Sequence, residues 1–134
     1  MSGVSIITQI LIASRDLVAV VPSARIKAGV LPLKTALPAI SITKISGTPR
    51  NTLAMNSAHY LETERVQVTV LAKDYPSLQS VLALVRSACP VSAGRVIAGF
   101  TVNSVLRDSE GPEFFDDEYE TYSASIDFMV VYTR

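Results

Sequence analysis

Carboxylate side chains gather in one short stretch towards the end of this chain. Five of them fall within eight residues: Glu113, Asp116, Asp117, Glu118 and Glu120. Carboxylate oxygens bind divalent cations, so the Asp116–Glu118 run together with Asp127 is one candidate for a carboxylate-dependent metalloenzyme. However, the glycine and ligand spacing of a calcium loop is missing, and consecutive carboxylates rarely converge on one ion. The sequence therefore favours a solvated loop or a docking surface, and we expect no metal and no cofactor.

Aromatic residues lie within and beside the acidic stretch: Phe114, Phe115, Tyr119 and Tyr122. Acid beside exposed rings is costly to leave in water and suits an interface. The alternative is that Phe114 and Phe115 fold back onto the core. Arg50, from an aperiodic segment, is a further candidate contact because a guanidinium can fork onto carboxylates, with a solvated arginine as the alternative. The predicted partner-contact residues are thus Arg50, Glu113, Phe114, Phe115, Asp116, Asp117, Glu118 and Glu120.

The residues needed for other kinds of catalysis are few in this sequence. Cys89 is the one cysteine, and the one histidine, His59, lies thirty positions away. A thiol nucleophile needs a nearby base, so we expect Cys89 to be a buried structural thiol. The chain has no glycine-rich phosphate loop, no His/Cys ligand spacing and no nucleophile elbow. We therefore expect a protein that is not an enzyme.

Hydrophobic periodicity predicts the elements that must position these residues. Apolar stripes predict one helix over 5–21 and a second from Asp74, as its cap, to Cys89. Alternation predicts strands over 39–46, 65–72, 96–107 and 121–133, with a short strand over 25–27 as an option. Gly47 and Pro49 are expected to end the first strand, and 47–64 to form a long mobile loop. The predicted fold class is α+β: a mostly antiparallel four-stranded sheet with two amphipathic helices packed on one face.

Size and charge narrow the class of protein. With 134 residues, 49% of them hydrophobic, one domain over 1–134 is expected. No stretch reaches the roughly 20 apolar residues of a membrane helix, so no membrane partner is expected, and 4–21 is a poor signal peptide. The net charge is zero, yet residues 1–58 hold six basic groups and one acidic group, whereas 108–134 hold eight acidic groups and one basic group. This polarity favours an internal salt-bridge layer or subunits that dock head-to-tail.

Three segments, in this order and spacing, carry a resemblance to a known family. They are RIKAGVLPLKTALPAISITKISGTP (Arg25–Pro49), ERVQVTVLAKDYPSLQSVLALVRSA (Glu64–Ala88) and DDEYETYSASIDFMVVY (Asp116–Tyr132). They include an Arg-Val-Gln-Val strand, an Asp-Tyr step before a helix, and an acidic loop before a Ser-x-Asp-Phe strand. Over nearly its whole length the chain resembles the tail-completion, or tail-terminator, proteins of long-tailed bacteriophages, prophages and gene-transfer particles.

The resemblance implies a structural virion protein at the tail–neck junction, assembled in the host cytoplasm. Such a protein caps the tail tube as a ring of about six subunits, closed by heterologous contacts. The implied partners are other copies of the chain, the tail tube protein and the neck, or head-completion, protein, while duplex DNA passes through the channel without sequence-specific binding. A neck or head-closure connector of the same particle is the near alternative. A metalloenzyme and a free-standing monomeric binding module are alternatives from other classes.

Two placements of the acidic stretch compete within this interpretation. The stretch could dock on basic residues of the adjacent subunit. It could instead line the bore, where negative charge keeps passing DNA from sticking, because phosphate contacts dominate affinity for DNA. The first placement is favoured, since the matching basic excess lies in the same chain.

Overall fold

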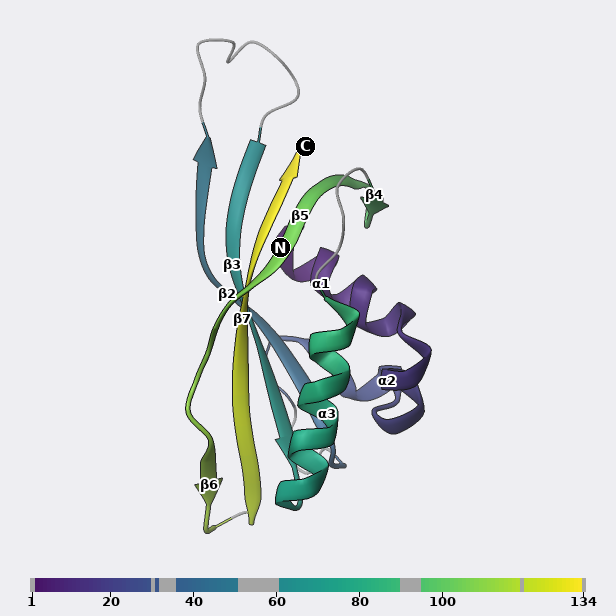
Figure 1. Cartoon of the computed structure of the whole chain (residues 1–134), viewed down its shortest axis with the longest axis vertical. Coiled ribbons are helices and arrows are strands. Elements are labelled where there is room, and N and C mark those ends of the chain that lie inside the picture. Colours follow the sequence, from purple (N-terminus) through teal and green to yellow (C-terminus); the bar gives the residue numbers. More distant parts are fainter. Residues whose placement is uncertain are drawn as a thin grey trace.

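The computed structural model describes residues 2–29, 31, 36–50, 61–89, 95–118 and 120–133. Helices and strands are mixed along the chain (Figure 1). In chain order the elements are α1 (Ser2–Ala13), α2 (Arg15–Val20), the 3-10 helix η1 (Ser23–Arg25), β1 (Ile26–Ala28), β2 (Ala39–Arg50), β3 (Leu61–Ala72), α3 (Tyr75–Ala88), β4 (Arg95–Ile97), β5 (Phe100–Glu110), β6 (Phe114–Asp116) and β7 (Thr121–Thr133).

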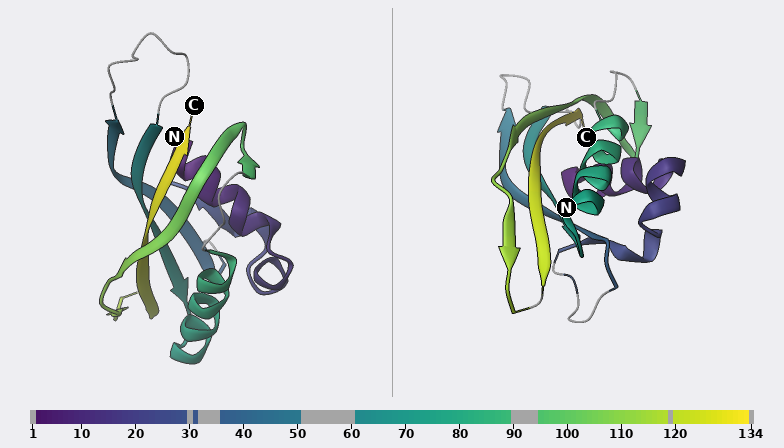
Figure 2. Two further views of the ribbon diagram at one scale, coloured as in Figure 1. Left: turned by 45° about the horizontal axis from the view of Figure 1, so that its top comes forward. Right: turned by 60° about the horizontal axis from the view of Figure 1, so that its bottom comes forward.

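The strands form one seven-stranded sheet in the order β1-β2-β3-β7-β5-β4, with β6 paired to the start of β7. β1 runs parallel to β2, and the other pairs are antiparallel. The sheet is twisted, and the α-helices lie on one side of it (Figure 1 and Figure 2). The α+β class is confirmed, but the expected four-stranded sheet is wrong, because β1, β4 and β6 add three strands of three residues each. β1 corresponds to the optional strand over 25–27, displaced by one residue. Strands as short as β4 and β6 show too few positions for an alternating pattern.

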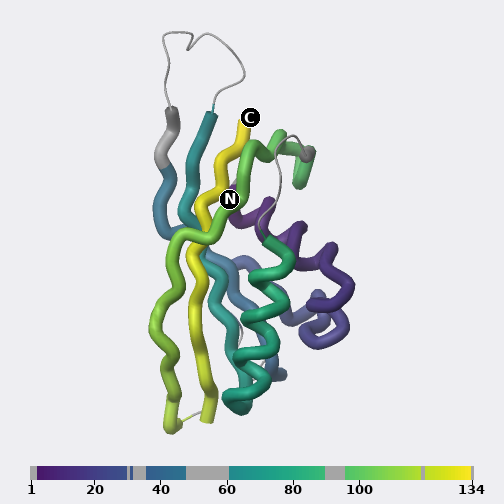
Figure 3. Tube along the Cα trace, viewed as in Figure 1, coloured from purple at the N-terminus to yellow at the C-terminus, as the bar shows by residue number. Residues whose placement is uncertain are grey.

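The last strand in the sequence, β7, runs through the middle of the sheet. It pairs with β3 along twelve positions on one side, and with β5 and β6 on the other. Figure 3 shows its yellow trace between those of β3 and β5. Every second residue of β7, from Ala124 to Tyr132, is buried against the helices, while the residues between them face away.

The first predicted helix is interrupted. α1 ends at Ala13 and α2 begins at Arg15, with Ser14 between them in an extended conformation. The hydroxyl of Ser14 accepts a hydrogen bond from the backbone N–H of Leu17 at 3.4 Å and so caps α2. The expectation of one helix over 5–21 is therefore wrong. The apolar stripe continues across Ser14, so periodicity alone hides the break.

β2 continues past the residues that were expected to end it. It runs through Gly47 to Arg50, with a bulge after Lys44, and Pro49 pairs with Glu62 of β3. β1 covers β2 along 40–42, and beyond that point β2 is an edge among the described residues, where a proline removes no ladder hydrogen bond. The loop expected over 47–64 is thus strand at both ends, and 51–60 lie outside the described residues.

The strand expected over 96–107 is instead a hairpin of β4 and β5. Ile97 pairs with Phe100, and Ala98 and Gly99 connect them with φ of 54° and 85°. Positive φ at both central residues is the requirement of a type I′ turn, whose twist matches that of the flanking strands. The glycine at the second position signals this turn in the sequence, whereas the alanine before it obscures the signal.

The core fills the space between the sheet and its helices. α1 contributes Ile6, Ile7 and Leu11, and α3 contributes Leu78, Val81, Leu82 and Val85, as its predicted stripe required. Asp74 begins α3 by accepting a hydrogen bond from the N–H of Ser77 at 2.8 Å, and this bond lowers the pKa of Asp74. Cys89 is fully buried, as expected. No helix among the described residues is long and apolar enough to cross a membrane.

Candidate interaction surface

The acidic stretch forms a hairpin at one end of the sheet (Figure 1). β6 pairs with the start of β7, Phe114 lying opposite Ser123. Oδ1 of Asp116 accepts a hydrogen bond from the N–H of Glu118 at 2.9 Å and tightens the turn, which Glu120 closes with a φ of 49°. Residues 111–118 and Glu120 are all exposed. The structure thus gathers seven of the eight predicted contact residues on this segment, which we call the acidic hairpin (111–120).

Two contacts hold the base of the acidic hairpin against α3. Glu113 accepts hydrogen bonds from the Tyr75 hydroxyl at 3.0 Å and from the Gln79 side chain, and the Tyr75 bond raises the pKa of that phenol. Nε of Arg86 lies 2.5 Å from Oε1 of Glu110, and this pairing lowers the pKa of Glu110. A hollow of about 270 Å³ lies between the two contacts. The hairpin base is therefore positioned by α3 and is not a free loop.

The aromatic rings lie at the surface. Phe114 and Phe115 are 62% and 48% exposed, so the alternative in which both fold back onto the core is wrong. Phe115 packs against Tyr122 with ring centroids 4.7 Å apart, and Tyr75 meets the same ring edge-on at 5.9 Å. The rings are thus held in place beside the carboxylates, and the hairpin presents apolar area and negative charge together.

The carboxylates do not converge as a metal site. Within the described part of the chain, no group of three or more His, Cys, Asp or Glu side chains could hold a metal ion. Asp116 pairs with Thr121, and Asp127 lies six positions further along β7. At roughly 3.3 Å per residue this separates them by about 20 Å. Asp127 is therefore too far from the Asp116–Glu118 run to share a metal ion with it.

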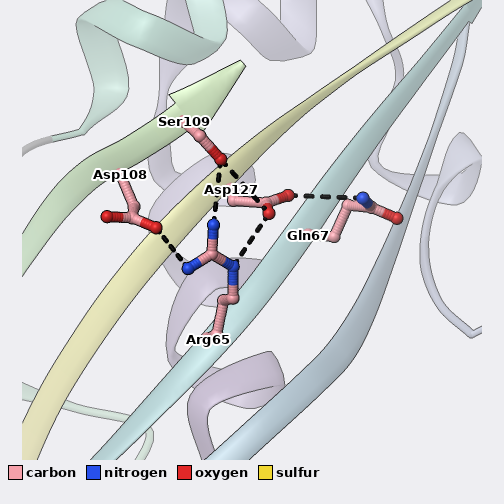
Figure 4. Close-up of polar contacts among 5 residues, drawn as sticks. All are labelled: Arg65, Gln67, Asp108, Ser109 and Asp127. Carbon is pink, nitrogen blue, oxygen red and sulfur yellow. Dashed lines mark hydrogen bonds and ion pairs between the residues drawn. The ribbon is translucent and has the colours of Figure 1, made fainter. Parts of the chain in front are cut away.

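A polar network that periodicity did not reveal lies on the sheet face opposite the helices (Figure 4). Nε of Arg65, on β3, donates to Oδ2 of Asp127, on β7, at 2.9 Å, and Nη2 donates to the Ser109 hydroxyl at 2.9 Å. Its Nη1 pairs with Asp108, and Gln67 donates to Oδ1 of Asp127 at 3.3 Å. The hydrogen bond to Asp127 is the main cause that raises the pKa of Arg65. The guanidinium is thus a fixed, fully charged cation with two carboxylates around it.

This network joins two motifs noted in the sequence. Arg65 and Gln67 belong to the Arg-Val-Gln-Val segment, and Asp127 belongs to the Ser-x-Asp-Phe segment. The register places Gln67 opposite Asp127 and Thr69 opposite Ser125, whose hydroxyls lie 3.0 Å apart. The sequence signal for this network was a charged residue at a solvent-facing position of each strand, Arg65 in β3 and Asp127 in β7. The pairing itself needed the register, which the sequence does not display.

Three residues of interest cannot be placed with the others. The backbone of Arg50 ends β2, far along the chain from the acidic hairpin, and its side chain lies outside the described part. His59 and Tyr119 lie outside the described residues altogether. The contact role of Arg50 therefore stays a prediction.

The fold is that of a known virion component. A solved chain from the "Virion of native gene transfer agent (GTA) particle" is similar to this one with a TM-score of 0.68 at 12% identity, covering 99% of this chain and 97% of that chain. At this identity the likeness concerns the fold.

The family is shown by a second comparison. The family model described as "Tail completion protein gp17" matches residues 6–133. The chain therefore belongs to the tail-completion family, and the resemblance seen in the sequence is confirmed. It is accordingly a structural protein of virion tails. No curated protein matches the chain.

Proposed function

We propose that this protein caps the tail tube as a ring of about six copies, closed by heterologous contacts, and provides the joint to the head. The family match over 6–133 carries this proposal. On this view the protein acts at the tail–neck junction after assembly in the host cytoplasm. Its partners are its own copies, the tail tube protein and the neck protein. As a single domain over 1–134 it performs no catalysis and takes no cofactor.

The acidic hairpin supports a role in contacts. It exposes Phe114 and Phe115 and carries carboxylates at Asp117, Glu118 and Glu120 that have no side-chain partner among the described residues. We assign Glu113, Phe114, Phe115, Asp116, Asp117, Glu118 and Glu120 to a subunit or partner contact, together with Arg50. The sheet face around Arg65, whose charge is matched by Asp108 and Asp127, suits a channel through which DNA passes without sticking.

The test uses particles that lack this chain. Their tails are expected to have irregular length and to remain unattached to heads, and added purified protein should restore attachment. Electron microscopy of the purified protein, alone and on isolated tails, should show rings of about six with a central hole. Strictly monomeric protein in both settings would contradict the proposal. Binding to isolated heads, with none to tubes, would favour the neck connector instead.

Charge reversal separates the two placements of the acidic hairpin. If it docks on a neighbouring subunit, Asp116→Lys with Asp117→Lys should impair ring formation while the monomer stays folded. Ring formation of the unaltered protein should also weaken with salt, since the screening length falls from about 10 Å at 0.1 M to about 3 Å at 1 M. If it lines the bore, the double variant should assemble and then retain DNA in the channel. Normal assembly with normal DNA passage would mean that the hairpin is a solvated surface.

A further inference from the structure

Two short strands end the sheet on opposite sides of its lower half. On one side β1 is the outermost strand, beyond β2, and on the other side β6 is the outermost strand, beside the start of β7. Each is three residues long, and each has one strand neighbour among the described residues. All of β6 is exposed, as are Lys27 and Ala28 of β1. An uncovered strand edge offers a row of backbone donors and acceptors to another strand.

The two edges lie at adjoining levels of the sheet. Through Ser41 and Thr69, Lys27 of β1 is level with Ser125 of β7. Phe115, the centre of β6, pairs with Tyr122, three positions before Ser125, which is an offset of about 10 Å at the usual rise of a strand. A second copy placed beside the first in the same orientation, and shifted by about 10 Å along the strands, therefore brings its β1 next to the β6 of the first.

The strand directions also fit. β1 is parallel to β2, and the two antiparallel steps from β2 to β3 and from β3 to β7 restore the same direction in β7. β6 is antiparallel to β7, and so it runs opposite to β1. Two copies in the same orientation thus present antiparallel edges, the arrangement with the better hydrogen-bond geometry.

The charges on the two edges are opposite. Arg25 and Lys27, at the β1 edge, have no ion pair among the described residues. The turn that follows β6 carries Asp117, Glu118 and Glu120, whose carboxylates are equally unpaired within the described chain. Like charges oppose pairing of β6 with β6 or of β1 with β1, whereas unlike charges favour β6 with β1. The charges on the two edge strands therefore favour a head-to-tail contact between copies.

We propose that β6 of one copy pairs antiparallel with β1 of the next, and that the acidic hairpin docks there on Arg25 and Lys27. This inference rests on the proposed ring and names the strands that close it. The contact is heterologous, as a ring requires. Because neighbouring strands are rotated by roughly 20–25°, the pairing relates the copies by a rotation as well as a shift.

A disulfide scan tests the pairing directly. In a Cys89→Ala background, Lys27→Cys combined with Phe115→Cys places one thiol at the centre of each edge strand. Directly opposed residues of antiparallel strands have Cα atoms about 4.5–5.5 Å apart, within disulfide range. Mild oxidation of assembled protein should give a ladder of covalent oligomers. Arg15→Cys with Phe115→Cys is the matched control, since Arg15 is exposed on α2, and it should give none.

Charge reversal and rescue give a second, independent readout. Arg25→Glu with Lys27→Glu should abolish rings, as should Asp117→Lys with Glu118→Lys. An equal mixture of the two double variants should form rings in which the variants alternate, because the hairpin of each then faces a β1 edge of opposite charge on the other. Arg15→Glu should assemble normally. Circular dichroism checks that each variant is folded. Rings that form without the disulfide ladder, or that tolerate both reversals, would overturn this inference and leave the proposed function standing. Absence of rings from the unaltered protein, even on isolated tails, would overturn both.

Discussion

The backbone N–H of Gly3, at the start of α1, donates a hydrogen bond to Oε2 of Glu64, in β3, at 2.6 Å. Glu64 is 4% exposed, and its other oxygen accepts a hydrogen bond from the Tyr132 hydroxyl at 2.9 Å and lies 3.7 Å from Nζ of Lys44. A buried carboxylate thus satisfies a free N–H at a helix N-terminus, where negative charge is favoured by the helix dipole.

Replacing Glu64 by Gln should destabilise the protein by about 1–3 kcal/mol, because the amide weakens charge-assisted bonds to groups that stay buried. Equilibrium unfolding in urea measures the change. Glu118→Gln is the control, since Glu118 is exposed and should alter the free energy of unfolding by less than about 0.5 kcal/mol. Equal effects of the two substitutions would show that Glu64 does not anchor α1.

Gly3→Ala should also destabilise the protein, although alanine normally stabilises a helix relative to glycine by about 1 kcal/mol. A Cβ at this position would collide with Oε2 of Glu64 and lie 3.0 Å from Cγ2 of Val66. The substitution therefore pushes the carboxylate away from the helix. A rise in the urea midpoint of Gly3→Ala would refute this close approach.

Ala98→Asn should stabilise the protein by about 1 kcal/mol, because left-handed backbone is costly for alanine and less so for asparagine. Ala98 has a φ of 54° and precedes Gly99, so the variant has the Asn-Gly pair that type I′ turns prefer. Thermal unfolding measures the gain. Ala28→Asn, on exposed β1, should show none, and an equal effect at both positions would mean that the turn is not the cause.

Cys89 should react with alkylating reagents far more slowly in the folded protein than in urea. Burial raises the pKa of its thiol to about 12 from an ordinary value of 9.0. Above pH 9.0 the unfolded chain releases this proton while the folded chain keeps it, so stability present below pH 9.0 should be lost progressively as pH rises towards 12. Cys89→Ala should show a smaller decline over that range, and an identical decline would assign the loss to other groups.

Asp127→Asn should lower the melting temperature by several degrees, and Asp108→Asn by less. The Asp127 side chain is 16% exposed and bonds both Arg65 and Gln67, whereas Asp108 is 38% exposed and pairs with Arg65. Scanning calorimetry of the two variants compares them directly. If Asp108→Asn has the larger effect, the guanidinium is held mainly from β5 and not from β7.

The sequence predicted the long elements well and the short ones poorly. Alternating valines marked β3, and the same period marked β7, because half-buried strands leave that imprint on every second residue. A three-residue strand such as β6 leaves none, and its exposed Phe114 resembles a loop residue. The break at Ser14 was hidden because packing against a common core keeps the apolar stripe continuous across α1 and α2.

In the candidate interaction surface, likewise, residues that are close in sequence were predicted and residues that are distant in sequence were not. The carboxylates and rings of the acidic hairpin are adjacent in sequence, so composition alone identified them. The network of Arg65 with Asp108 and Asp127 draws on three strands, and its members are up to 62 positions apart. Only the register brings them together, and register is a property of the folded sheet.

The central position of β7 has a consequence for synthesis of the protein. Because β7 follows the other strands in the sequence and pairs with β3, β5 and β6, a nascent chain cannot close its sheet until this segment has left the ribosome. Chains truncated before residue 121 would leave three strands without their shared neighbour and should be cleared by proteases. Prematurely terminated chains would therefore not be incorporated into an assembling particle as incomplete subunits that block it.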